Sequence, residues 1–365
     1  MSNQPQIVLH IGTMKSGTTY LQHGIINQLA ELESAGWLYP LDFAPAQGAI
    51  NQERAIYGLV GNQIPWVDQK TQQRMHSQWL SLKAQIDNSE KSILISAEAL
   101  ASMLEEGIEL LLSQLPNREI KIVITARDLA RVLPSSWQQS VRNGRTYSYE
   151  DYFERIKRAA ELPLTDAVGS NFWRSYQLNQ VVQRWSKFVP IANITIVTVP
   201  PKQSSESLWT RFITATGLPL DSAEPRFDDK RAHAAISWSE AEVLNELNLK
   251  WAQSNKSVSE RNKLRRKIVH EGFQQREHRG RWIGLTAPWL SLAKTWADTD
   301  VAKLIQAQVR IVGDINELRV DPALAPVEPC PAAEIAAARV IAARFHDRMR
   351  LRAVARLLNI PRKSR

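Results

Sequence analysis

The sequence has a single cysteine, Cys330, among 365 residues. One thiol can form neither an intrachain disulfide nor a cysteine-based zinc site, so both features are excluded. The cysteine lies in a proline-rich run, residues 326–331, and we interpret it as incidental. Because stable disulfides belong to oxidising compartments, this cysteine usage predicts a protein of a reducing compartment.

Long apolar segments are also missing. No run of about 18 apolar residues occurs, so the sequence predicts no transmembrane helix. No basic segment precedes the short apolar run at residues 7–9, which argues against a secretory signal peptide. These absences predict a cytoplasmic protein. The inner face of the membrane is an alternative location, which depends on the basic tail described next.

Excess positive charge is scarce outside the last 32 residues. Residues 334–365 contain nine Lys or Arg and two Asp or Glu, whereas residues 1–333 carry 37 basic against 35 acidic residues. A nearly balanced body argues against a nucleic-acid-binding protein. The tail is predicted to be a weakly amphipathic helix, for which contact with a partner protein or with an anionic membrane are the two alternatives.

Short apolar runs alternate with segments of helical periodicity over the first 200 residues. This alternation predicts an α/β protein with a mostly parallel sheet flanked by helices. From about residue 234 onward the pattern is mainly helical. The expected strands are residues 7–11, 37–39, 92–96, 120–125 and 194–199, and the expected helices include residues 21–32, 71–88, 100–115 and one beginning at Pro134.

The chain is expected to divide into three regions. Residues 1–320 form one α/β domain, in which residues 41–70 are an irregular loop rich in Gln, Asn, Gly and Pro. Residues 321–333 are a Pro/Ala-rich linker, and residues 334–365 are the basic helical tail. No internal repeat is present.

The turn at residues 12–19, Gly-Thr-Met-Lys-Ser-Gly-Thr-Thr, follows the first strand and precedes a helix. Backbone N–H groups at a helix N-terminus bind phosphate, and the helix dipole favours negative charge there. Lys15 adds a positive charge, and Ser16, Thr18 and Thr19 add hydroxyl donors. A Walker A loop needs its lysine directly after the second glycine, but Lys15 precedes Gly17. This order argues against an ordinary ATPase or GTPase. A turn that merely caps the helix is the alternative.

The run Lys15-Ser16-Gly17-Thr18-Thr19 resembles the 5′-phosphosulfate loop of the sulfotransferase family that uses 3′-phosphoadenosine 5′-phosphosulfate (PAPS). The resemblance implies a P-loop-like sulfotransferase fold over residues 1–320. It also implies PAPS as the donor substrate, no metal, and an acceptor that carries a hydroxyl group. It gives Lys15 the role of stabilising charge on the leaving phosphate. The other donor-binding residues that it implies in this segment are Gly12, Thr13, Ser16, Gly17, Thr18, Thr19 and, beside the adenine, Tyr20.

A second phosphate site is expected after the strand at residues 120–125. Arg127 ends that strand and Ser135 follows eight residues later. An arginine fork and a serine in the first turn of a helix can converge on one phosphate. Sulfotransferases use Arg and Ser at this spacing to bind the 3′-phosphate of PAPS, so the resemblance implies that role for Arg127 and Ser135. Ser136 is the alternative to Ser135.

Transfer to a hydroxyl needs a base that accepts its proton. Glu98 follows the strand at residues 92–96, and the carboxyl ends of parallel strands face the ligand crevice. The resemblance supports Glu98, because many carbohydrate sulfotransferases place a glutamate there. A helix-terminal acid that balances the dipole is the other interpretation of Glu98. His10 and His23 are rival bases. No metal site is predicted, because no cluster of ligands at suitable spacing occurs.

The sequence therefore predicts a PAPS-dependent sulfotransferase. A glutamate base indicates a sugar or glycolipid hydroxyl as the acceptor. Two other classes stay open: a P-loop nucleotide or small-molecule kinase, which the lysine position disfavours, and a nucleic-acid or anionic-membrane binding protein, which rests only on the basic tail.

Overall fold

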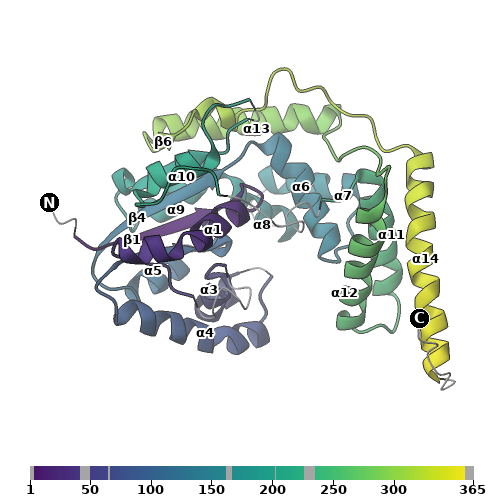
Figure 1. Cartoon of the computed structure of the whole chain (residues 1–365). Helices are drawn as coiled ribbons and strands as arrows, with labels where there is room; N and C mark the ends of the chain where they lie inside the picture. Colours follow the sequence, from purple (N-terminus) through teal and green to yellow (C-terminus); the bar gives the residue numbers. More distant parts are fainter. Residues whose placement is uncertain are drawn as a thin grey trace. The chain divides into compact units, whose positions relative to one another are not determined.

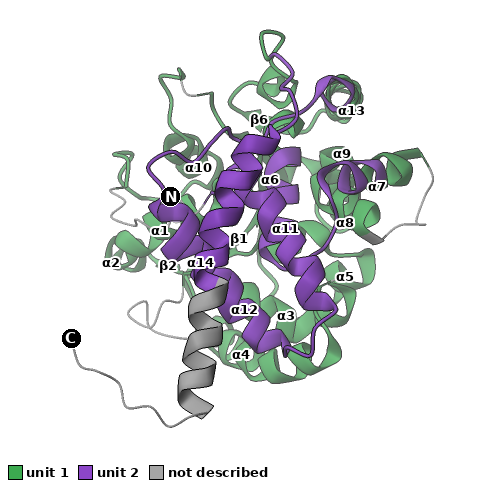
Figure 2. Cartoon of the chain, turned by 90° about the vertical axis from the view of Figure 1, so that its right-hand side faces the viewer, with its two compact units in different colours: residues 1–132, 155–228, 291–324 green, residues 133–154, 229–290, 325–365 purple. Residues whose placement is uncertain are grey.

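The structure is a computed structural model that describes residues 4–41, 50–64, 66–161, 167–201, 203–225 and 235–357; side chains of residue 167 and of residues 346–357 are not described. The chain folds into two compact units (Figure 2). Unit 1 contains residues 1–132, 155–228 and 291–324, and unit 2 contains residues 133–154, 229–290 and 325–365.

Unit 1 is built around a six-stranded sheet in the order β2-β3-β1-β4-β5-β6 (Figure 1). Every pairing is parallel, so the predicted α/β class with a parallel sheet is confirmed. Five strands match expected positions, and β6 was not predicted. The strands are β1 (Gln6–Gly12), β2 (Trp37–Leu38), β3 (Ser92–Ser96), β4 (Glu119–Ala126), β5 (Ile194–Thr198) and β6 (Arg310–Val312).

The central strand β1 is buried at every position, as expected where helices cover both faces of a parallel sheet. Ile7, Leu9 and Ile11 belong to one apolar cluster and Val8 belongs to another. The first cluster includes side chains of α3 (Glu53–Val60), α4 (Gln69–Asp87), α5 (Glu105–Ser113), α9 (Leu178–Ser186) and α13 (Ala287–Gln306). The second includes side chains of α1 (Thr18–Asn27), α2 (Leu29–Ser34) and α10 (Leu208–Thr216).

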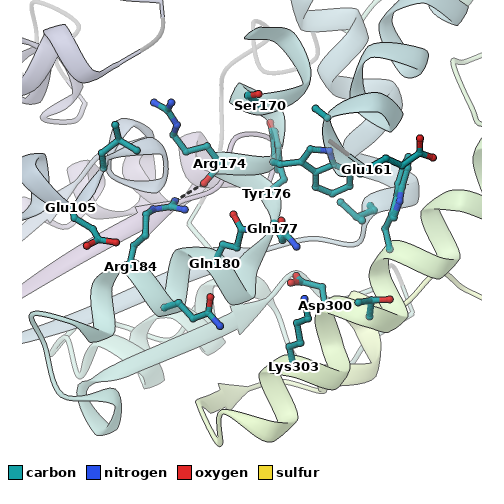
Figure 3. A pocket seen from close by; sticks show the side chains of 18 of the residues that line it. Glu105, Glu161, Ser170, Arg174, Tyr176, Gln177, Gln180, Arg184, Asp300 and Lys303 are labelled. Carbon is teal, nitrogen blue, oxygen red and sulfur yellow. Dashed lines mark hydrogen bonds between the residues drawn. The ribbon is translucent and has the colours of Figure 1, made fainter. Parts of the chain in front are cut away.

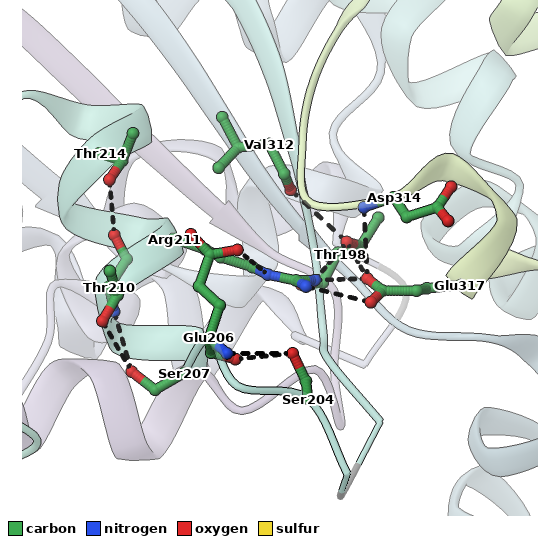
Figure 4. A network of polar contacts seen from close by, with 10 residues as sticks. All are labelled: Thr198, Ser204, Glu206, Ser207, Thr210, Arg211, Thr214, Val312, Asp314 and Glu317. Carbon is green, nitrogen blue, oxygen red and sulfur yellow. Dashed lines mark hydrogen bonds and ion pairs between the residues drawn. The ribbon is translucent and has the colours of Figure 1, made fainter.

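The β5–β6 edge of the sheet is held by the buried guanidinium of Arg211 (Figure 4). Its Nη1 donates to the Thr198 carbonyl at 3.1 Å, its Nε to Glu206 Oε2 at 2.8 Å, and its Nη2 to Glu317 Oε1 at 3.0 Å. Two carboxylates thus balance one buried cation. Arg211 therefore has a structural role, because its side chain binds the end of β5 to Glu206 and Glu317.

Unit 2 is helical. Ser237 and Glu240 form a capping box at the start of α11 (Trp238–Ala252), and the fully buried Glu240 carboxylate is paired with Arg276 and Arg279. The elements of unit 2 include the later part of α6 (Leu129–Arg142), the start of α7 (Tyr149–Glu161), α11 (Trp238–Ala252), α12 (Val258–Lys267), the π-helical turn η5 (Ile268–Gly272) and α14 (Ala332–Leu357).

The predicted tail helix corresponds to α14, of which the described side chains end at residue 345; residues 358–365 lie outside the described residues. Ala338 and Ala342 are buried, and Arg339 donates to Glu246 of α11 at 2.6 Å. Before the helix, the Val327 N–H donates to the Leu285 carbonyl at 2.9 Å. The first part of the tail therefore packs within unit 2, and the three-region division stays a prediction.

Two expected element boundaries were wrong. The segment at residues 41–70 contains α3 and the short 3-10 helix η2 (Gly61–Gln63), although residues 42–49 and 65 lie outside the described residues. The helix expected to begin at Pro134 begins at Leu129, so Pro134 lies inside α6. Over the described residues, no helix combines the length and apolarity needed to cross a bilayer.

Candidate active site

The turn between β1 and α1 lies at the carboxyl edge of the sheet, between β3 and β4. Its backbone requires glycine at Gly12, because an added Cβ would lie 1.7 Å from Thr18 Cγ2. Lys15 and Gly17 both have positive φ, 69° and 85°. Glycine adopts this conformation easily, whereas a non-glycine residue such as Lys15 rarely does. The strained turn ends at Gly17, and α1 begins with Thr18.

The hydroxyl groups of Thr13, Ser16 and Thr18 bind the protein itself. Thr13 Oγ1 donates to the Thr125 carbonyl at 2.9 Å. Ser16 Oγ donates to the Thr13 carbonyl at 2.6 Å and lies 2.9 Å from Thr125 Oγ1. Thr18 Oγ1 donates to the Glu98 carboxylate. These bonds fix the turn to β4 and to Glu98, which follows β3. Because these three hydroxyl groups already have partners, the N–H groups at the start of α1 are better placed than the hydroxyls to donate to a phosphate.

Arg127 follows β4 and points one end of its guanidinium at the turn. Its Nη1 donates to the Lys15 carbonyl in a long hydrogen bond of 3.5 Å. Its Nε is buried and has no hydrogen-bond partner among the described residues. Burial and the nearby Arg131 both lower the pKa of Arg127. Whereas Arg211 is balanced by two carboxylates, Arg127 keeps donor capacity for an anion.

Ser135 does not lie where the sequence placed it. It belongs to the second turn of α6, where backbone N–H groups are used within the helix, because the helix begins at Leu129. The division between the two units also falls within α6, so Arg127 and Ser135 belong to different units. The alternative, Ser136, is buried and donates to the Leu133 carbonyl at 2.7 Å. A phosphate contact by Ser135 stays a prediction.

Glu98 opens the short 3-10 helix η3 (Glu98–Ser102), directly after β3. Its side chain is partly exposed and accepts the hydrogen bond of Thr18. Burial raises the pKa of the Glu98 carboxyl, and the Thr18 hydrogen bond and the Lys15 charge oppose that shift. The structure therefore brings Glu98 and the phosphate-type turn together, and a carboxylate with a raised pKa is a stronger base.

The two rival bases are placed differently. His10 is fully buried in β1, with Nδ1 2.8 Å from Ser96 Oγ and Nε2 3.2 Å from Thr125 Oγ1. Burial lowers the pKa of His10 to about 3. It therefore joins β3 and β4 through β1 as a neutral, fully buried residue. His23 lies in the second turn of α1.

Comparisons with known proteins give no family assignment. No family model matches the chain, and no curated protein matches it. Among solved structures, a sulfotransferase from Alicyclobacillus acidocaldarius is 11% identical with a TM-score of 0.37, covering 71% of this chain and 98% of its own. The sulfotransferase domain from the curacin biosynthetic pathway is 14% identical with a TM-score of 0.31, covering 62% of this chain and 80% of its own. At these values neither likeness decides the function.

A second carboxylate beside Glu98 escaped the sequence analysis. Glu53, on α3, accepts the N–H of Ala99 at 3.1 Å. Burial, together with repulsion from Glu98, raises the pKa of Glu53 to about 7, against a hydrogen bond from Tyr57. The position was missed because α3 lies in the segment expected to be irregular. Its helical spacing of buried residues, Ile56 and Val60, was the available signal.

A cavity of about 770 Å³ lies in unit 1 beside η3 (Figure 3). Its walls come largely from α9, α13 and α8 (Ala167–Tyr176). Arg184 connects it to the segment that carries Glu98, because its guanidinium donates to the carbonyls of Ala101 at 2.8 Å and Met103 at 3.0 Å. The walls combine the aromatic rings of Trp173, Tyr176 and Trp296 with the amides of Gln177, Gln180 and Gln183. Among the described residues, no group of three or more His, Cys, Asp or Glu could hold a metal.

Glu53→Gln should be more stable, relative to the wild type, at pH 8 than at pH 4. A folded-state pKa of about 7, above the ordinary 4.5, makes stability fall as the pH rises between these values, because the unfolded chain ionises first. Glutamine keeps the acceptor for Ala99 and cannot ionise. After discounting for partial exposure, we expect the difference in unfolding free energy between variant and wild type to increase by about 1–3 kcal/mol. Urea unfolding at both pH values measures it.

The matched control is Glu109→Gln, which changes an exposed glutamate on α5. Its effect on unfolding should be the same at pH 4 and pH 8. A Glu53→Gln difference that also stays constant across this range would show that Glu53 is ordinarily solvated, and would remove it from the site.

Proposed function

We propose that the chain is a sulfotransferase that moves a sulfuryl group from PAPS to an acceptor hydroxyl. One observation carries the proposal. At a single edge of the sheet, the β1–α1 turn with Lys15, the incompletely paired Arg127 and the carboxylate of Glu98 lie together. An anion cradle beside a base is what transfer of an anionic group to a hydroxyl requires.

The donor would lie with its 5′-phosphosulfate on the turn. The N–H groups at the start of α1 hold its oxygens, and Lys15 faces the bridging oxygen of the leaving phosphate. Arg127 takes the 3′-phosphate. Tyr20, in the first turn of α1, packs partly buried against the second apolar cluster and is the predicted neighbour of the adenine.

In the transfer, the acceptor oxygen forms a bond to sulfur while the bond between sulfur and the phosphate oxygen breaks. The acceptor proton passes to the Glu98 carboxylate. The leaving adenosine 3′,5′-bisphosphate takes the electron pair, and its new negative charge is stabilised by Lys15 and by the N–H groups of the turn. Both contacts gain strength in the transition state, which is the condition for catalysis.

The acceptor would enter from the cavity beside η3. Aromatic faces and planar amides suit a molecule that has both apolar faces and hydroxyl groups. The rings of Trp173 and Trp296 are packed edge to face, with their centroids 5.0 Å apart, which fixes their positions in the wall. These features support a sugar or glycolipid hydroxyl as the acceptor.

Adenosine 3′,5′-bisphosphate should stabilise the protein to heat well beyond AMP, in EDTA as in magnesium. The reason is that Arg127 binds the 3′-phosphate, which AMP lacks. Arg127→Ala should weaken binding of the bisphosphate by about ten- to a hundredfold, the value of one charge-assisted contact, and should leave AMP binding nearly unchanged. Thermal-shift titrations measure all four combinations.

The control for loss of a positive charge is Lys121→Ala. Lys121 lies in β4, the strand that Arg127 follows, and its side chain is partly exposed. It should bind both nucleotides like the wild type. Equal stabilisation by AMP, or a strict requirement for magnesium, would contradict the proposal and favour the kinase alternative.

A further inference from the structure

A second cavity lies within unit 2, lined by residues at the end of α6, in α12 and in η5. Its volume is about 540 Å³, within the range of about 300–1,000 Å³ that small-molecule sites occupy. One apolar side chain, Val269, lines it. The other lining residues are polar or basic: Gln139, Arg142, Asn143, Asn262, Arg265, Arg266 and His270.

The lining is strongly one-sided in charge. It contains three arginines and one histidine, and none of its residues is Asp or Glu. Arginines in the last turn of a helix interact favourably with its dipole, and this accounts for basic residues at the ends of α6 and α12. It does not account for their gathering around one hollow, because like charges repel each other there.

Arg265 shows how the site is built. It is only 8% exposed, and its Nε donates to Asn248 Oδ1 at 3.0 Å while its Nη1 donates to Asn262 Oδ1 at 2.7 Å. Asn248 is fixed in turn by donating to the carbonyls of Val141 and Arg145, at 2.8 and 3.0 Å. Neutral amides hold this guanidinium in place without neutralising its charge.

The backbone also makes room for this side chain. Gly144 follows α6 with a φ of 90°, and an added Cβ would lie 2.2 Å from Arg265 Nη2. The guanidinium therefore packs directly on the backbone of the turn. Arg142, at the end of α6, is partly buried, and its burial lowers its pKa. In the part of unit 2 that the structure describes, no carboxylate lies within 4 Å of the Arg142, Arg265 or Arg266 side chain.

We propose that this cavity binds the phosphate or sulfate group of a small polar molecule. Arginine forks match the oxygens of a tetrahedral oxoanion, and a pair of them fixes its orientation. The amides of Gln139 and Asn143, which are joined by a 2.9 Å hydrogen bond, supply neutral donors and acceptors for the rest of the ligand. Val269 is one apolar side chain among polar and basic ones, so the lining offers little contact to a lipid chain as that remainder. The inference is independent of the proposed transfer reaction.

The test is equilibrium dialysis of the full chain against radiolabelled inorganic phosphate, inorganic sulfate and glucose 6-phosphate, with ionic strength held constant by chloride. Arg142→Gln and Arg266→Gln should each weaken the binding of at least one probe by about ten- to a hundredfold. Lys263→Gln is the control. It removes one positive charge from an exposed residue of α12, the helix that carries Arg266, but outside the cavity. This variant should bind the probes like the wild type.

Arg127→Ala separates this site from the β1–α1 turn, because it should leave the binding that depends on Arg142 unchanged. Binding of inorganic phosphate or sulfate would identify the free ion as a sufficient ligand. Binding of glucose 6-phosphate alone would identify an ester. The proposal is overturned if no probe binds at millimolar concentration, or if both arginine variants bind like Lys263→Gln while their melting curves show folded protein.

Discussion

Glu98→Gln should lower kcat by about 10²–10⁴-fold, the contribution of a positioned base. Glutamine keeps the size of the side chain and can still accept the Thr18 hydrogen bond, but it cannot take up a proton. Donor affinity and thermal stability should therefore change little. Steady-state kinetics with the true acceptor, together with a thermal-shift titration of adenosine 3′,5′-bisphosphate, separate the two effects.

Glu90→Gln is the matched control, since Glu90 is exposed and precedes β3. It should turn over like the wild type. A Glu98→Gln kcat within threefold of wild type would retire Glu98 as the base. Glu53 would then be the next candidate, because it lies against η3 and its pKa of about 7 suits proton transfer near neutral pH.

Lys15→Ala should lower kcat by about 10²–10³-fold, as the loss of one donor to a developing oxyanion does elsewhere. The N–H groups of the turn already hold the ground-state phosphates, so donor affinity should fall much less. The lysine acts as charge grows on the leaving oxygen, and an interaction made mainly in the transition state is expressed in kcat.

Lys15→Arg keeps the positive charge and the same left-handed backbone requirement at this position. It should retain more activity than Lys15→Ala. If both variants only raise the KM for the donor and leave kcat unchanged, Lys15 binds the ground state and the transition state equally and has no role in the chemical step.

The strands and the phosphate-type turn were predictable because their signals are local. Residues 7–9 and 93–95 are continuous apolar runs, and the turn directly follows the strand that contains the first of them. What Ser16 does was not predictable, because its partner Thr125 lies 109 residues away in the sequence. A hydroxyl in such a turn looks the same whether it faces a ligand or braces the backbone.

Two other errors have physical causes. Pro134 was interpreted as a helix start because proline is favoured in the first turn, but α6 begins five residues earlier and accommodates the proline in its interior. The polar composition of residues 41–70 hid α3, which is held by packing of Ile56 and Val60 on the core. Glu53 was therefore missed, although repulsion from the Glu98 carboxylate contributes to its raised pKa.

The cavity in unit 2 could not be inferred from the sequence either. Arg142 and Arg265 are separated by more than a hundred residues, and each alone is an ordinary basic residue near a helix end. Only the fold gathers them with amides and without a carboxylate.

Sulfuryl transfer from PAPS can be measured by incubating the purified full chain with PAPS that carries radiolabelled sulfur, using a metabolite and lipid extract as the source of acceptors. The account predicts a labelled product, equimolar adenosine 3′,5′-bisphosphate, activity in EDTA, and near-complete loss of both products with Lys15→Ala and Glu98→Gln. Label that stays on PAPS in every extract, or transfer that both variants support at the wild-type rate, would contradict it.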